Sequence, residues 1–130
     1  MIIVVGYVPT PEGVAALDYA TAAALRDSAT LVVVNSGARG DDSGPSFVSQ
    51  AELDALADQL TGLGLTYEIR QPTHAFSPAE EVLGAAKDTG ADLIVVGLRR
   101  RSPVGKLFLG STSQQILLEA DCPVVAVKEP

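Results

Sequence analysis

Cysteine, histidine and aromatic residues are scarce in this sequence of 130 residues: it has one cysteine, one histidine and no tryptophan, and aromatic residues make up 5%. A single cysteine excludes an intramolecular disulfide, and we expect Cys122, just before an apolar stretch, to be a small buried hydrophobic residue. The histidine, His74, has no serine or cysteine partner in a recognisable motif, so we expect it at the surface. The sequence therefore gives no support to nucleophilic catalysis.

Basic residues are also few, with nine lysines and arginines against sixteen acidic residues and a formal net charge of −7. This balance argues against binding to nucleic acid or to an anionic membrane, because both depend on a basic surface. No apolar run approaches the ~20 residues that span a bilayer, and the first residues have neither a basic segment nor a cleavage site. We therefore expect a cytoplasmic protein with one domain over residues 1–130.

Five short strands alternate with four helices in the predicted secondary structure. Apolar, β-branched runs predict strands buried on both faces, and they cover residues 2–5, 31–34, 93–96 and 123–127. Residues 65–70 alternate between apolar and polar side chains, which indicates a strand at the edge of a sheet. Helices are predicted at about 11–28, 49–62, 77–90 and 113–119, and the buried face of the first is expected to carry Val14, Leu17, Ala24 and Leu25.

This alternation predicts a single three-layer α/β/α domain built on a five-stranded parallel sheet. With right-handed crossovers and the third strand at an edge, the economical strand order is 3-2-1-4-5. The order reverses between the first and fourth strands, and ligands bind such sheets at the carboxyl ends of the strands beside that point. Those ends carry segments 6–13 and 97–110, which we expect to form one site.

The second of these segments concentrates cations on an acidic chain. Four of the nine basic residues lie within eight positions, and they are Arg99, Arg100, Arg101 and Lys106. Glycines occur at 97, 105 and 110, and a Ser-Thr-Ser run at 111–113 stands where a helix is expected to begin. Backbone N–H groups at a helix start, small residues and guanidinium groups together favour an anion such as phosphate. The alternative is an ordinary helix start with an N-cap hydroxyl, beside a solvated run of arginines.

The fifth predicted strand has no polar face and would form the second edge of the sheet. Its residues are Val124, Val125, Ala126 and Val127. Because an exposed apolar edge invites strand pairing, we expect a homodimer in which two copies of this strand meet across a twofold axis. The alternative is shielding by the C-terminal residues 128–130.

The spacing of the glycines resembles a motif of the universal stress protein family. Its nucleotide-binding members have Gly, two residues, Gly, nine residues, Gly, then Ser or Thr, and the corresponding positions here are Gly97, Arg100, Gly110 and Ser111. The segment 120–127 also resembles the end of the family's sequences, and the likeness extends over the whole chain. The resemblance implies a Rossmann-like fold of the adenine-nucleotide alpha-hydrolase type and a role in the stress response.

The resemblance also implies a site for an adenine nucleotide, with ATP favoured and Mg²⁺ held mainly by the phosphates and water. Phosphate contacts would come from Gly97, Gly110, Ser111, Thr112 and Ser113, with charge from Arg99, Arg100 or Lys106. Gly6, Tyr7, Val8 and Pro9 would border the nucleoside, and Val34 would line the base. No carboxylate cluster forms a dedicated metal site, and the pair Asp41 and Asp42 is expected in a solvated loop.

Two positions depart from the family pattern. Arg100 replaces the second glycine, so its side chain either restricts the approach of a phosphate or adds a contact to it. Val8 replaces an aspartate near the nucleoside, and valine cannot accept a hydrogen bond from a sugar or base. AMP and cyclic AMP therefore stay open beside ATP, as does a nucleotide-free dimer that acts through protein contacts. An enzyme of phosphate-transfer chemistry is the weakest alternative, and we expect at most slow ATP hydrolysis.

Overall fold

The structure is a computed structural model of the chain, and it describes residues 1–35, 48–71, 77–100, 107–108 and 110–129. Five strands form a parallel sheet, namely β1 (Ile2–Tyr7), β2 (Thr30–Asn35), β3 (Tyr67–Arg70), β4 (Leu93–Arg100) and β6 (Val124–Lys128). Their order is β3-β2-β1-β4, with β6 paired to the far side of β4. The predicted order 3-2-1-4-5 is confirmed, because β6 is the fifth strand of the prediction.

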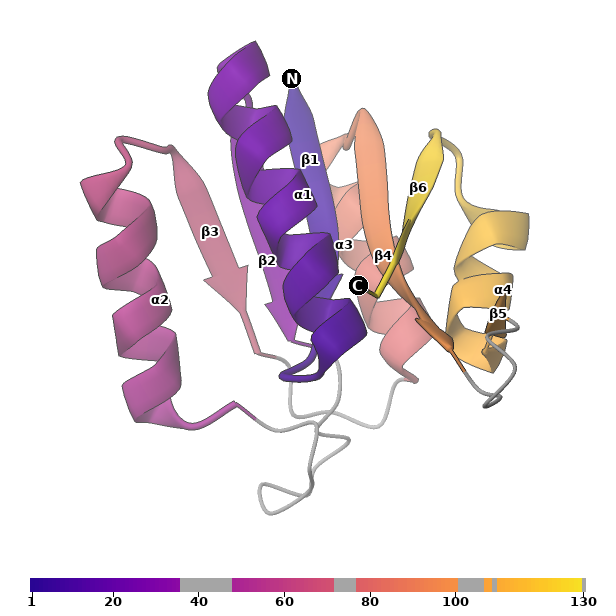
Figure 1. Ribbon diagram of the computed structural model, residues 1–130. Helices are drawn as coiled ribbons and strands as arrows, with labels where there is room; N and C mark the ends of the chain where they lie inside the picture. Colours follow the sequence, from indigo (N-terminus) through magenta and orange to yellow (C-terminus); the bar gives the residue numbers. More distant parts are fainter. Residues whose placement is uncertain (36–47, 72–76, 101–106, 109, 130) are drawn as a thin grey trace.

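Four helices complete the domain, namely α1 (Pro11–Asp27), α2 (Gln50–Gly62), α3 (Pro78–Thr89) and α4 (Ser111–Glu119). Figure 1 shows α1 and α2 in front of the sheet and α3 behind it. Side-chain caps begin three of the helices: Thr10 accepts from the Gly13 N–H, Ser49 from Glu52, and Ser77 forms a capping box with Glu80. Among the described residues, no helix is long and apolar enough to cross a membrane.

The core has two layers, one on each face of the sheet, which explains why the central strands are apolar throughout. On the front face, alternate residues of β1, β2 and β4 pack against small residues of α1, chiefly Ala16, Ala20 and Ala24. On the back face the other half of each strand packs against α3 and Ile116 of α4. The prediction for α1 was partly wrong: Val14 and Leu25 are exposed, because the helix approaches the sheet through its alanines.

The strands beside the predicted site are longer than the sequence indicated. β1 continues through Gly6 and Tyr7, which pair with Val34 and Asn35 of β2. β4 continues past residue 96 to Arg100, because Gly97 pairs with Val127 of β6 and the last two residues pair with a short antiparallel strand, β5 (Leu107–Phe108). The prediction that a loop begins at Gly97 was therefore wrong, because β4 extends to Arg100. The short strand β5 was not predicted.

The start of α4 also differs from the prediction. The helix begins at Ser111, two residues before the predicted start, and Gly110 is its N-cap. The first helical hydrogen bond runs from the Gln114 N–H to the Gly110 carbonyl. The Ser-Thr-Ser run therefore forms the first turn of the helix.

Candidate functional site

The carboxyl ends of β1 and β4 lie next to each other, where the strand order reverses. β1 leads through Tyr7, Val8 and Pro9 into α1 in a tight turn, in which the Thr10 N–H donates to the Val8 carbonyl at 2.8 Å and the Thr10 hydroxyl accepts from the Gly13 N–H at 3.2 Å. A Cβ on Gly13 would overlap the carbonyl group of Val8, whose carbon would lie at 2.9 Å. The glycine therefore lets α1 begin directly beside the strand end.

Gly97 brings the starts of two helices together. A Cβ at this position would overlap the main chain of Glu12 in the first turn of α1, with the Glu12 carbonyl carbon at 2.7 Å. The Gly97 carbonyl accepts a hydrogen bond of 3.4 Å from the Ser113 hydroxyl, in the first turn of α4. Close packing therefore requires glycine at position 97, whether or not a ligand approaches it.

The start of α4 has the properties of an anion site. No side chain caps it among the described residues, since Gly110 offers none. The N–H groups of the first turn, at Ser111, Thr112 and Ser113, precede the first intrahelical bond and carry the positive end of the helix dipole. Ser111 is exposed, and Thr112 and Ser113 are half-buried. An anion can therefore reach these donors from the edge of the sheet.

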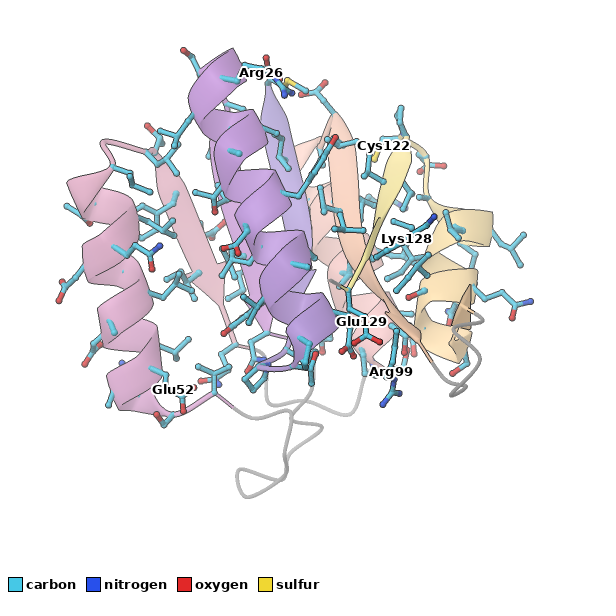
Figure 2. All side chains as sticks on the ribbon, in the orientation of Figure 1. Arg26, Glu52, Arg99, Cys122, Lys128 and Glu129 are labelled. Carbon is cyan, nitrogen blue, oxygen red and sulfur yellow. The ribbon has the colours of Figure 1, made fainter. Side chains whose placement is uncertain are left out.

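Arg99 supplies a cation at the same edge, and Figure 2 shows it near the end of the sheet where α1 begins. Its Nε lies 3.9 Å from a carboxylate oxygen of Glu12, with 62% of the Arg99 side chain exposed and 13% of the Glu12 side chain. An ion pair this exposed and this long is weak, so Arg99 can turn to a bound anion at little cost. The side chain of Arg100 and residues 101–106, including Arg101, Gly105 and Lys106, lie outside the described part of the chain.

The predicted nucleoside side of the site is formed mainly by main chain. Val34 is fully buried in the back core, and a Cβ on Gly6 would lie 3.3 Å from Val82 in the same core. The Tyr7 ring packs against the front core, and burial, followed by the charges of Glu52 and Asp18, raises the pKa of its phenol. Only Val8 and Pro9 of this group lie in the turn at the edge, half-buried. A nucleoside there would meet apolar side chains and backbone groups.

Asn35 is a buried residue of this edge, one position beyond the strand predicted at residues 31–34. It is fully buried, and its amide nitrogen donates to the Tyr7 carbonyl at 2.9 Å. Its amide oxygen accepts from the Val48 N–H at 3.3 Å and from Gln71 at 2.9 Å, and Gln71 also donates to the Val48 carbonyl. These bonds join the ends of β1, β2 and β3 to the residue before the α2 cap. The available signal was a polar amide directly after an apolar strand.

Other candidate residues do not join this site. Within the described ranges, no three histidine, cysteine or acidic side chains are grouped to hold a metal ion. His74, Asp41 and Asp42 lie outside those ranges. Cys122 was expected to be a small buried hydrophobic residue, and it packs against the back core while staying partly exposed. Burial and the charges of Asp121 and Asp92 raise the pKa of its thiol. A cavity of about 440 Å³ along α3 shares only Val34 with the predicted residues.

Comparison with known proteins agrees with the fold and the strand order. The sequence profile of the Universal stress protein family matches residues 1–128. Over 126 residues the chain is 40% identical to a universal stress protein of Mycolicibacterium smegmatis, covering 97% of this chain and 96% of that protein. The structure of a universal stress protein from Archaeoglobus fulgidus matches with a TM-score of 0.75 and 25% identity, over 98% of this chain and 97% of that one. A universal stress protein in complex with cAMP matches with a TM-score of 0.72 and 21% identity, over 100% and 98% of the two chains. This chain therefore belongs to the universal stress protein family.

Proposed function

We propose that this protein is a cytoplasmic stress-response regulator that binds an adenine nucleotide where β1 and β4 end. The observation that carries the proposal is the start of α4, which lies beside Gly97 and has no side-chain cap among the described residues. A phosphate there would receive backbone N–H groups from the first turn and charge from Arg99. A structural neighbour in complex with cAMP supports an adenine nucleotide as the ligand.

Most of the predicted residues have a role in this proposal. Gly110, Ser111, Thr112 and Ser113 hold the phosphate, and Gly97 keeps the first turns of α1 and α4 against β4. The main chain of Gly6, Tyr7, Val8 and Pro9 borders the nucleoside, while Val34 supports the site from the core. Nucleotide binding can regulate contacts with other proteins only if this edge of the sheet has different conformations with and without the nucleotide. The proposal therefore requires that binding orders segments that other proteins contact. We expect at most slow ATP hydrolysis.

The ligand is tested by thermal unfolding of the full chain with AMP, cyclic AMP, ADP and ATP, each with and without Mg²⁺. A nucleotide at ~100 times its dissociation constant stabilises the protein by ~2.7 kcal/mol. Ser111→Glu places a carboxylate on an exposed position of the first turn, where it favours the helix but repels an anion. Ser111→Gln is the matched neutral control. We expect the glutamate variant to lose the shift and the glutamine variant to keep it; equal shifts in both would contradict a phosphate at this turn.

A homodimer through β6 is a second part of the proposal. β6 pairs with β4 on one side, and its other side has no partner strand among the described residues. The bonds from Ile94 N–H to the Pro123 carbonyl and from Glu129 N–H to the Leu98 carbonyl show that odd-numbered residues of β6 face β4. The peptide groups of Val124, Ala126 and Lys128 therefore face outward, available to a second copy.

The dimer is tested by removing one outward donor. Ala126→Pro deletes an N–H that faces away from β4, so the β4–β6 ladder is kept. Ala126→Ser keeps the backbone and is the control. Sedimentation equilibrium should show a dimer for the wild type and the serine variant and a monomer for the proline variant. A proline variant that stays dimeric would exclude this edge as the interface.

A further inference from the structure

A carboxylate lies among the cation and helix N–H groups of the candidate site. Glu12 is the second residue of α1, and its side chain is 13% exposed and 3.9 Å from the Arg99 Nε. Its main chain is fixed between the Thr10 cap and the contact with Gly97. The main chain that carries this carboxylate is therefore held at the edge by the packing of the first turn of α1.

The negative charge of Glu12 repels each negative charge on a bound ligand. The first turn of α4 can receive one phosphate, and Gly97 connects that turn to the turn that carries Glu12. Further phosphates add negative charge at the same edge, where Arg99 already shares its charge with Glu12. Two like charges about 7 Å apart in water-like surroundings change an equilibrium by about threefold, and the effect grows as water is excluded. Glu12 therefore lowers the affinity for a ligand with two further negative charges by about tenfold relative to a neutral residue at position 12.

We propose that Glu12 is a specificity-determining residue that limits the charge of the bound nucleotide, so that the site takes an adenosine monophosphate, linear or cyclic, in preference to ATP. This inference rests on the proposed adenine-nucleotide site and names the ligand class. It also assigns a role to a half-buried acidic side chain beside a predicted phosphate contact. Mg²⁺ neutralises part of the ATP charge and so reduces the discrimination.

The test is calorimetric titration of the full chain with AMP and with ATP in EDTA, comparing wild type with Glu12→Gln. We expect the wild type to bind AMP more tightly than ATP. The glutamine variant should lower this ratio by about tenfold, chiefly through a gain in affinity for ATP. Asp58→Asn is the matched control, because it removes one negative charge from an exposed position of α2, and it should leave the ratio within about twofold.

A measurement on the wild type alone covers the case in which Glu12→Gln does not fold. Raising the salt concentration from about 50 to 500 mM screens the repulsion, so the preference for AMP over ATP should narrow. Binding of both nucleotides with a ratio that neither Glu12→Gln nor salt changes overturns the role of Glu12 and leaves the proposed function standing. Absence of binding by wild type and variant overturns both.

Discussion

The close packing at Gly97 gives a sharp prediction about stability. In Gly97→Ala the new Cβ would lie 2.7 Å from the Glu12 carbonyl carbon, against main chain rather than a flexible side chain. Relief requires the first turn of α1 to move away from β4. Overpacking of this kind costs about 2–3 kcal/mol, so we expect Gly97→Ala to unfold at a temperature about 8–12 °C below the wild type.

Gly84→Ala is the matched control for this prediction. Gly84 lies inside α3, is exposed, and has nothing within 4 Å of the position that a Cβ would take. Alanine is favoured over glycine inside a helix by about 0.5–1 kcal/mol, so this variant should unfold about 2–4 °C above the wild type. Calorimetry or circular dichroism measures both. If Gly97→Ala unfolds within about 2 °C of the wild type, the contact between α1 and β4 is looser than described.

Two further predictions concern the buried edge. Asn35→Ala leaves the Tyr7 carbonyl and the Val48 N–H without their amide partner. We expect this variant to lower the free energy of unfolding, measured in urea, by about 2–4 kcal/mol. A loss under about 1 kcal/mol would show that water replaces the amide. The raised pKa of Tyr7 gives stability that is fully present below the unfolded-state pKa of about 10 and is lost as the pH rises through the higher folded-state pKa. Tyr7→Phe should therefore show a smaller loss of stability than the wild type between pH 9 and 11 in urea titrations, and parallel curves would contradict a raised phenol pKa.

The sequence predicted the strand order because two signals were local. The β-branched runs marked strands covered on both faces, and the alternation in residues 65–70 placed β3 at an edge, where it pairs only with β2. The ends of β1 and β4 were misplaced because Gly6 and Gly97 were taken for loop residues. Both are strand residues that lie against other elements, Gly97 tightly against the main chain of α1, which no local pattern reveals.

The face of α1 was misjudged for a related reason. Val14 and Leu25 are large and apolar, yet both are exposed, and Ala16 and Ala20 are fully buried. The prediction weighed the size of the side chains, whereas the helix needed small ones to approach the sheet closely. The first turn of α1 lies directly against Gly97 of β4, which shows how closely the helix approaches the sheet.

The parts of the candidate site that the sequence could indicate are those whose residues are neighbours along the chain. The first turn of α4 was recognisable from Gly110 and the hydroxyl run that follows. The carboxylate of Glu12 reaches the site only because α1 packs on a strand that lies more than eighty residues later in the chain. Asn35 depends in the same way on Tyr7 and Gln71, which come from two different strand ends.

The bonds of Asn35 have a consequence for how this edge of the sheet can move. One buried amide holds the Tyr7 carbonyl at the end of β1, the Gln71 side chain after β3 and the Val48 N–H before α2. None of these three segments can shift without breaking a bond to the same side chain, and each broken bond leaves a buried polar group at a cost of about 1–3 kcal/mol. Motion at this edge is therefore concerted, and a displacement at one strand end is transmitted to the others.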